Sequence, residues 1–144
     1  MPTLDTTIRR FQAADRNTRL ETLLDYSRKL PPLPPEFAEL KAKGVNRVPE
    51  CQTEVYLWVT VDADDRVHVY ADVPREAPTV RGFLALLVKN LENATPADVA
   101  AVPDDILDRL ALTETLGMTR TQGLTAILGR IKRGVRESTE RTNK

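Results

Sequence analysis

Cys51 is the residue whose type and position most directly suggest covalent chemistry. It is the only cysteine among 144 residues, and it lies in the polar stretch RVPECQTE just before the strand-like run VYLWV. A free cysteine is most often buried, but polar neighbours on both sides favour a loop. The adjacent Glu50 and nearby Glu54 disfavour the thiolate, the form that acts as a nucleophile. From its spacing alone, Cys51 is equally compatible with a reactive and with an inert role.

His68 is the only histidine, and it lies within a stretch of alternating apolar and polar residues. No carboxylate or serine partner for it can be identified from the sequence, so we expect a solvated or packed imidazole rather than a catalytic base. One cysteine and one histidine cannot form the usual zinc or iron–sulfur site within the chain. Motifs for phosphate binding or for a nucleophilic serine are also absent. We therefore expect no tightly held metal and no resident cofactor.

Arg120 is a second residue that local stability does not explain. It lies at the predicted start of the last helix, where the positive end of the helix dipole disfavours a cation. The cost of such an arginine is small, about 0.3 kcal/mol or a little more. On these grounds alone, an ordinary surface arginine remains the simpler interpretation.

Length and charge indicate one domain with no general affinity for polyanions. A chain of 144 residues can bury its own hydrophobic core, and its 21 basic and 21 acidic side chains give a formal net charge of zero. The N-terminal sequence MPTLDTTIRR lacks the long apolar stretch of a signal peptide or membrane span. Because a single cysteine cannot form an internal disulfide, we expect a protein of the reducing cytoplasm.

Helical periodicity is clearest in three places. Residues 18–30 carry leucines at helical spacing, with Thr18 and Glu21 as a predicted capping box. The proline run PPLPP should end this helix, and Pro35 should open another that ends near Gly44. The strongest pattern lies in residues 78–92, where one apolar stripe should cover a sheet. That stripe consists of Val80, Phe83, Leu84, Leu87, Val88 and Leu91.

Strand periodicity appears only in the middle of the chain. From Val55 to Val61 every second residue is aliphatic, and the same alternation returns from Val67 to Val73 after the polar turn DADD. This pattern predicts an antiparallel hairpin. Gly82, inside the predicted helix over residues 78–92, indicates a close approach by the backbone of a neighbouring element.

The remaining elements are predicted to be connectors and a closing helix. Thr95 and Pro96 have the positions of a helix cap and a first helical residue, and another short helix is expected from about Pro103 to Leu110. The last helix should begin with a capping box formed by Thr119 and Gln122.

Several motifs in order resemble those of one known family. CQTEVYLWV, an acid-containing hairpin, APTVRGFLALL, NATPADV and LALTETLGMTRTQGL follow one another much as they do in the SufE family of sulfur-acceptor proteins. The resemblance extends from Leu20 to Arg136, and several ordered motifs are far more specific than a lone cysteine.

The resemblance implies an α+β, SufE/NifU-like fold, in which helices pack on a small, curved, mainly antiparallel sheet of about three strands. Residues 45–48 would supply the third strand. It also implies a single SufE-like domain over residues 1–136, with residues 137–144 as a flexible C-terminal tail.

In the SufE family, the cysteine that corresponds to Cys51 accepts sulfane sulfur from the persulfide of a pyridoxal-phosphate cysteine desulfurase, typically SufS. The resemblance therefore implies a sulfur-transfer accessory protein, not an autonomous enzyme, that carries a persulfide on Cys51 and stimulates the desulfurase. A SufBCD-type scaffold for iron–sulfur cluster assembly would receive the sulfur. Neither nucleic acid nor a membrane is an expected partner.

Four further residues are assigned by the same resemblance. Arg120 matches the arginine of the family pattern R-x-Q-G-[LM], which implies docking of the partner or stabilisation of the anionic sulfur. Gln122, in the same pattern, and Gln52, after the cysteine, are expected binding residues together with Glu50. Many members have glycine where this chain has Glu50, and the exchange changes both the backbone freedom of the loop and the charge beside the thiol.

Two other functions compete with the sulfur carrier. In the first, the chain is a non-catalytic protein-interaction module, Cys51 is structural, and the sheet face that carries Tyr56, Trp58 and Tyr70 binds a protein. In the second, the chain is an autonomous thiol enzyme such as a peroxidase. A persulfide on Cys51 after incubation with a desulfurase would distinguish the carrier from both.

Overall fold

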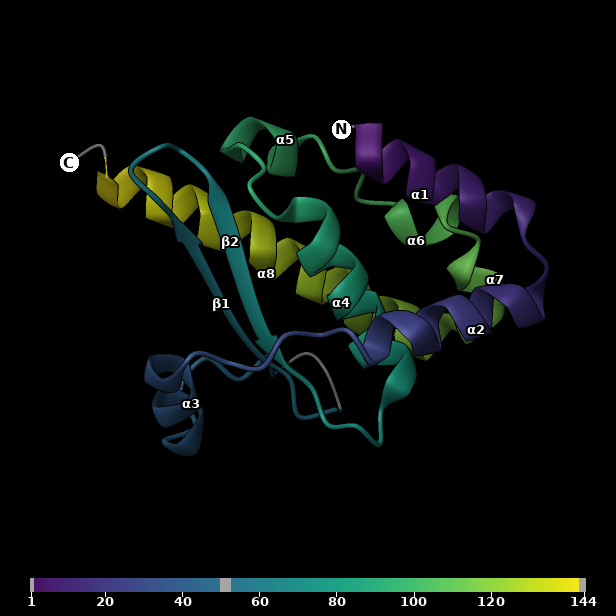
Figure 1. Ribbon diagram of the computed structural model, residues 1–144, viewed down its shortest axis with the longest axis horizontal. Helices are drawn as coiled ribbons and strands as arrows, with labels where there is room; N and C mark the ends of the chain where they lie inside the picture. Colours follow the sequence, from purple (N-terminus) through teal and green to yellow (C-terminus); the bar gives the residue numbers. More distant parts are fainter. Residues whose placement is uncertain (1, 50–52, 143–144) are drawn as a thin grey trace.

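The computed structural model of the protein describes residues 2–49 and 53–142. Figure 1 shows a two-stranded hairpin beside a group of helices, with α3 set apart below the hairpin and α1 and α2 at the opposite side. The elements follow the chain as α1 (Pro2–Ala13), α2 (Arg16–Ser27), α3 (Pro35–Ala42), β1 (Tyr56–Val61), β2 (Val67–Asp72), α4 (Pro78–Leu91), α5 (Pro96–Ala100), α6 (Ile106–Arg109), α7 (Leu112–Leu116) and α8 (Met118–Thr142).

The predicted hairpin is confirmed, and so is the α+β fold class. β1 and β2 pair antiparallel from Tyr56 opposite Asp72 to Val61 opposite Val67. The strand count differs from the prediction, since the described residues form two strands and not three. The segment expected as a third strand makes only an isolated bridge, in which Arg47 pairs with Tyr56. Ladder pairing does not extend from this bridge into a longer strand.

Two long helices cover the inner face of the hairpin, with α8 on β1 and α4 on β2. Every residue of the apolar stripe predicted for α4 is buried. On α8, Gly134 lies so close to β1 that an added Cβ would be 3.0 Å from Val59 Cβ. Further along, Val61 N donates to Ser138 Oγ at 3.2 Å. One hydrophobic core therefore lies between the hairpin and the helices.

The predicted close approach at Gly82 is found between α4 and α2. A Cβ at Gly82 would overlap the carbonyl oxygen of Leu23 and lie 2.9 Å from its carbonyl carbon. The next residue back, Arg81, donates from Nε to Ser27 O at 2.8 Å and from Nη1 to Val73 O. Arg81 thus ties the end of α2 to the segment after β2, and it orients the first turns of α4.

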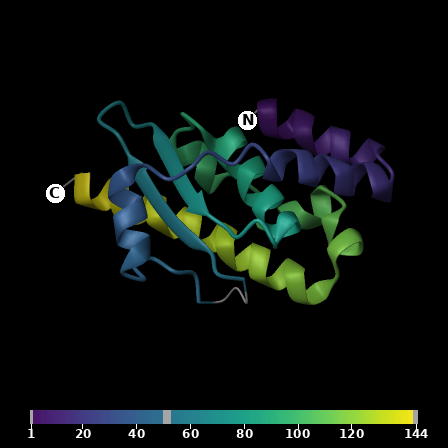
Figure 2. The same cartoon turned by 60° about the horizontal axis from the view of Figure 1, so that its bottom comes forward.

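The outer face of the hairpin is covered by α3. Phe37 of α3 contacts Trp58 and Tyr70, with ring centroids 5.2 and 4.7 Å apart. Because successive side chains of a strand point to opposite faces, this places α3 across the hairpin from α8. Figure 2 shows the two helices on either side of the strands.

Two predicted helix starts are wrong by a few residues. The cap of α2 is Asp15, whose carboxylate accepts from Thr18 N at 2.8 Å, and not Thr18 itself. A carboxylate is favoured there by the positive end of the helix dipole. α8 begins at Met118, directly after Gly117 with its φ of +83°, so Thr119 lies inside the helix instead of capping it.

The segments between α4 and α8 are short helical turns. Thr95 and Asp98 form a capping box at the start of α5, in which each side chain accepts from the other's backbone N–H. The helix expected from Pro103 to Leu110 is shorter, and α7 is an additional turn that the sequence pattern did not predict. Lys132 of α8 holds this region by donating to Asp104 at 2.9 Å.

The last helix continues to Thr142, well past Gly134, although the sequence after Val135 is polar and charged. Val135 is buried, and this contact with the core explains why the helix does not stop at the glycine. The tail expected from residue 137 therefore begins inside α8.

Candidate functional site

The first turns of α4 and α8 border a hollow of about 660 Å³, here called the α4–α8 hollow. Polar and apolar side chains share its walls. The lining residues are Thr53, Glu76, Ala77, Pro78, Thr79, Val80, Thr119, Arg120, Gln122, Gly123 and Leu124.

Local sequence signals bring these two helix starts into position. Pro78 is the first residue of α4, where its fixed φ favours helix and its missing N–H removes a donor that would have no helical partner. At the other helix, Gly117 adopts a left-handed φ of +83° between α7 and α8, a conformation that glycine allows without strain. The chain can therefore reverse sharply and direct the first turn of α8 toward α4.

Arg120 is anchored at the hollow by a hydrogen bond across the two helices. Its Nη1 donates to Thr79 Oγ1 at 3.1 Å, and the pair is exposed to solvent. Because an arginine has five N–H donors, this bond leaves others for an anion or a partner. Glu76 lines the same hollow, so one acidic and one basic side chain meet there.

Two of the predicted site residues, Arg120 and Gln122, come together at this hollow. The other three, Glu50, Cys51 and Gln52, lie outside the described residues. Thr53, the first described residue after them, lines the hollow. Through Thr53, the wall of the hollow is therefore joined directly to the cysteine segment of the chain.

Thr79 and Glu76 are lining residues that sequence reasoning did not assign. Thr79 belongs to the stretch APTVRGFLALL, and Glu76 directly precedes it. The apolar stripe of that stretch was used only to predict the helix. The position of Thr79 directly after a helix-opening proline was an available signal, because it puts the hydroxyl at an exposed helix start.

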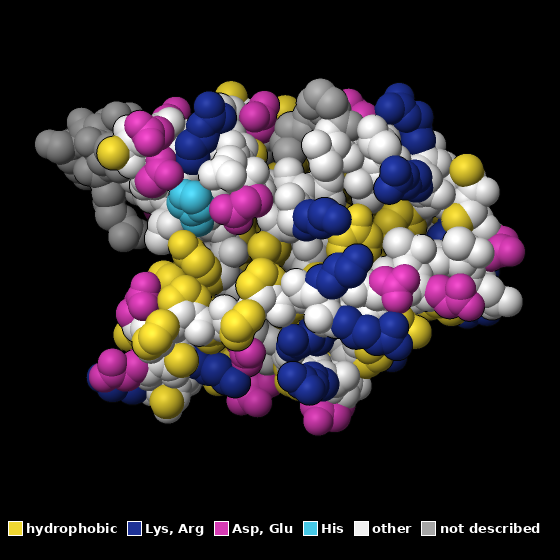
Figure 3. Space-filling model, in the orientation of Figure 1, with side chains coloured by type: hydrophobic (Ala, Val, Ile, Leu, Met, Phe, Trp, Pro, Cys, Tyr) yellow, Lys and Arg dark blue, Asp and Glu magenta, His cyan; other side chains and the backbone are white. Residues whose placement is uncertain are grey.

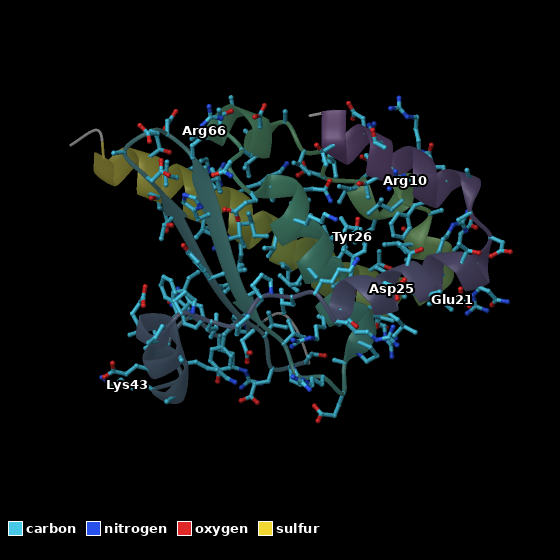
Figure 4. The ribbon with its side chains drawn as sticks, viewed as in Figure 1. Arg10, Glu21, Asp25, Tyr26, Lys43 and Arg66 are labelled. Atoms are coloured by element: carbon cyan, nitrogen blue, oxygen red, sulfur yellow. The ribbon has the colours of Figure 1, made fainter. Side chains whose placement is uncertain are left out.

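His68 has two partners that could not be identified from the sequence. Its Nε2 lies 2.8 Å from Asp62 Oδ2, and its Nδ1 lies 3.1 Å from Glu92 Oε1. The hydrogen bond with Asp62 is the main cause of the raised pKa of His68, and Glu92 contributes. His68 does not line the α4–α8 hollow. Its contacts link the hairpin turn to the end of α4, as does Arg66, labelled in Figure 4, which donates to Asn93 O at 3.1 Å.

The aromatic face considered as a protein-binding surface is occupied within the chain. Tyr56 and Trp58 are 6% and 5% exposed, and their rings stack with centroids 6.3 Å apart. Lys41 of α3 adds an ion pair with Asp72 at 2.6 Å. With Phe37 packed on Trp58 and Tyr70, this face offers a partner little apolar area.

Neither a metal cluster nor a membrane helix is found in the part of the chain that the structure describes. Over residues 2–49 and 53–142, no three His, Cys, Asp or Glu side chains are grouped as a metal site would require. In the same residues, no helix has both the length and the apolar character needed to cross a bilayer.

The chain is similar to proteins from several organisms. An uncharacterized SufE-like protein of Mycobacterium tuberculosis is 37% identical over 128 residues, which is 89% of this chain and 87% of the relative. The sulfur acceptor protein CsdE of Escherichia coli is 35% identical over 106 residues, covering 73% of this chain and 68% of the relative.

A solved structure and a family model agree with these relatives. The solution structure of a hypothetical protein from Thermus thermophilus superposes with a TM-score of 0.82 at 35% identity and covers 96% of this chain and 97% of that protein. The family model described as "SufE: Fe-S metabolism associated domain" matches residues 5–135. Since that match takes in both strands, α4 and the first turns of α8, the chain belongs to the SufE family.

Proposed function

We propose that this protein accepts sulfane sulfur on Cys51 from the persulfide of a SufS-type cysteine desulfurase and passes it to a SufBCD-type scaffold for iron–sulfur cluster assembly. The family match over residues 5–135 supports a role in iron–sulfur biogenesis. The observation that carries the proposal is that Arg120, Gln122 and Thr53 line one hollow. Of these three residues, Thr53 directly follows the cysteine segment in the sequence.

The transfer is a thiol–persulfide exchange that needs no external oxidant or reductant. The Cys51 thiol loses its proton, and the thiolate attacks the outer sulfur of the donor persulfide. A new sulfur–sulfur bond forms on Cys51 while the bond within the donor persulfide breaks, and the donor cysteine leaves as a thiolate. Sulfur at the sulfane level moves from one protein to the other, so one cysteine is sufficient.

Arg120 has the position and charge to assist this exchange. A persulfide is anionic when deprotonated, and a guanidinium beside it favours the charged form. The hydrogen bond to Thr79 fixes the guanidinium at the mouth of the hollow, which lowers the entropy lost when it binds an anion or the partner. Gln122, two residues further along α8, also lines the hollow and adds a neutral donor and acceptor to it.

The protein would act as an accessory to the desulfurase. The pyridoxal cofactor and its Schiff-base lysine belong to the partner, which releases sulfur from free cysteine. By removing the persulfide from the desulfurase, the acceptor would free the donor cysteine for the next turnover. The covered aromatic face of the hairpin favours this proposal over the interaction module.

The test is persulfide formation on Cys51. The purified protein is incubated with a SufS-type desulfurase, pyridoxal phosphate and sulfur-labelled cysteine, and the peptide with Cys51 is analysed by mass spectrometry without reductant. We expect label on Cys51 and faster desulfurase turnover. The matched control is Cys51→Ser, which keeps size and polarity but should carry no label and should not stimulate.

Two results would count against the proposal. An unlabelled Cys51 with unchanged desulfurase turnover would favour the interaction module. Stimulation by Cys51→Ser equal to that by the unmodified protein would show that binding alone activates the desulfurase, and the carrier role would fail.

A further inference from the structure

A second hollow lies at the same end of α4 as the α4–α8 hollow. It has a volume of about 400 Å³ and is here called the arginine hollow. Pro78, the first residue of α4, lines both hollows, so the two are neighbours on the surface. The arginine hollow is lined by Leu24, Ser27, Arg28, Arg75, Pro78 and Arg81.

The arginine hollow concentrates positive charge in a chain with no net charge. Half of its six described lining residues are arginines, and none of the six carries a carboxylate. Glu76, although next to Arg75 in the sequence, lines the other hollow. Figure 3 shows dark-blue side chains gathered over and beside the end of α2. Like charges held together do not stabilise the fold, so this grouping calls for another explanation.

The contacts of Arg81 and Arg28 leave most of their positive charge available to a ligand. Arg81 is fixed by its bonds to Ser27 O and Val73 O, two neutral carbonyls that do not cancel its charge. Arg28 pairs with Asp25 at 3.1 Å, but both side chains are mostly exposed, 74% and 65%, and such pairs are weak. Asp25 lies on α2, where Figure 4 labels it.

Arg75 and Leu24 give the hollow the composition of a protein interface. Within the described part of the chain, no hydrogen bond or ion pair engages Arg75. Leu24, 37% exposed, is one of the few large hydrophobic side chains that are exposed among the described residues. Met118, another of these and 75% exposed, directly precedes Thr119 of the α4–α8 hollow. Arginine next to exposed apolar surface is enriched in binding sites for proteins.

We infer that the arginine hollow binds an acidic surface segment of the same desulfurase that delivers sulfur to Cys51. This inference rests on the proposed function. A carboxylate can accept two parallel N–H bonds from an arginine, so aspartate or glutamate side chains fit these guanidinium groups well. Because Pro78 borders both hollows, a protein whose reactive loop reaches the α4–α8 hollow can contact the arginine hollow as well.

The distribution of charge favours a protein over a nucleic acid. A polyanion is bound by many basic groups arranged along its backbone, and the sequence provides no excess of them, with 21 basic and 21 acidic side chains. A single basic hollow suits a short acidic segment instead. Its main effect would be on partner choice and on the rate of encounter.

Charge reversal tests the inference. The variants are Arg28→Glu, Arg75→Glu and the double variant, each compared with the unmodified protein. Calorimetry measures their affinity for a purified SufS-type desulfurase. A desulfurase assay measures the concentration of each variant that gives half of the maximal activation. We expect the double variant to need about tenfold more protein for half-activation, a difference that corresponds to about 1.4 kcal/mol of binding. The plateau of activation should not change, and the difference should shrink at high salt.

Matched variants separate this effect from a general one. Arg9→Glu makes the same charge change on α1, at a residue that lines neither hollow, and should leave half-activation unchanged. Arg75→Lys keeps the charge without the planar fork and should lie between the unmodified protein and Arg75→Glu. Thermal unfolding of each variant shows that the chain is folded.

The outcomes distinguish the inference from the proposed function. Equal half-activation by the double variant and the unmodified protein, with labelled Cys51 in both, overturns the inference and leaves the carrier role standing. The absence of label on Cys51 in the unmodified protein overturns both. Binding of a duplex DNA oligonucleotide that the double variant loses, with unchanged affinity for the desulfurase, assigns the hollow to nucleic acid and also overturns the inference.

Discussion

Arg120 Nη1 and Thr79 Oγ1 lie 3.1 Å apart, and their hydrogen bond joins the first turns of α8 and α4 across 41 positions of the sequence. Neither residue is buried, so the bond contributes little to the stability of the fold. Its effect is to hold one guanidinium at the edge of the α4–α8 hollow. The pair therefore links a helix start to the proposed chemistry.

Thr79→Val should slow sulfur transfer without loosening the fold. The substitution keeps the shape of the side chain but removes the acceptor, so the Arg120 guanidinium loses its fixed position. A hydrogen bond contributes about 0.5–1.5 kcal/mol, which predicts a loss of about two- to tenfold in the rate of persulfide formation on Cys51. Single-turnover transfer from a desulfurase persulfide measures this rate.

Two controls isolate the contact. Thr79→Ser keeps the hydroxyl and should retain most of the rate. In the background of Arg120→Ala, Thr79→Val should cause no further loss, because the bond is already absent. A full additional loss in that background would contradict a positioning role for Thr79.

Gly82→Ala should destabilise the protein although alanine favours helix. The new Cβ would overlap the carbonyl of Leu23, so α2 and α4 would have to separate. Overpacking costs about 1–3 kcal/mol, and the helical preference of alanine offsets about 1 kcal/mol of it. We expect the free energy of unfolding in urea to fall by up to about 2 kcal/mol.

Gly129→Ala is the matched control for this change. Gly129 is also inside a helix, but a Cβ there would meet no atom within 4 Å. The same substitution should therefore raise stability by up to about 1 kcal/mol. If both alanine variants were equally stable, the close approach at Gly82 would not limit the packing of the two helices.

Removal of His68 should cost stability in acid and much less in base. The pKa of His68 is raised, chiefly by its hydrogen bond with Asp62, so its contribution is fully present below the ordinary histidine pKa of 6.5 and is lost as pH rises through the raised value. The pKa of Asp62 is lowered, with His68 as the main cause, so that contribution is lost as pH falls below the ordinary aspartate value of 3.8.

The largest effect of His68→Gln is therefore expected between about pH 4 and pH 6.5. Thermal unfolding of the unmodified protein and of His68→Gln from pH 4 to pH 9 measures this loss of stability. Because the contacts are partly exposed, we expect a loss of at most about 1 kcal/mol. A difference in melting temperature that grew toward alkaline pH would contradict the assigned contacts.

Phe37→Ala should detach α3 from the hairpin and expose Trp58. The Phe37 ring contacts both Trp58 and Tyr70, and truncation removes this contact. Because Trp58 is the only tryptophan, its fluorescence reports on this site alone, and we expect a shift to longer wavelength and stronger quenching by acrylamide. Unchanged emission would mean that other contacts hold α3. Sulfur acceptance on Cys51 should persist, since α3 does not line the α4–α8 hollow.

The sequence predicted best those elements that local pattern determines. The apolar stripe of α4 and the alternation in β1 and β2 depend on burial of one face, and both were confirmed. The precise helix starts depend on which of several polar side chains reaches a free N–H. At α2 the pattern predicted Thr18 as the cap, and only the fold shows that the carboxylate of Asp15 accepts from Thr18 N.

Contacts distant in sequence were beyond the reach of pattern. The partners of His68, Asp62 and Glu92, lie six positions before and 24 positions after it, and nothing local relates the three. The bond between Arg120 and Thr79 is of the same kind. Arg120 and Gln122 were assigned to the site by resemblance, and both line one hollow. The roles of all five assigned residues, these two together with Glu50, Cys51 and Gln52, stay predictions.

One uninterrupted helix makes the two ends of the molecule mechanically dependent on each other. α8 has 25 residues, a length of about 37 Å, with Arg120 in its first turn and Ser138 near its last. A rigid rod cannot tilt at one end without moving at the other, so a force on the first turn reaches the edge of the sheet. The backbone N–H of Val61 donates to Ser138, at the far end of α8, so it would respond to a movement of the first turn. Its rate of hydrogen exchange would register a docked partner far from the surface that the partner touches.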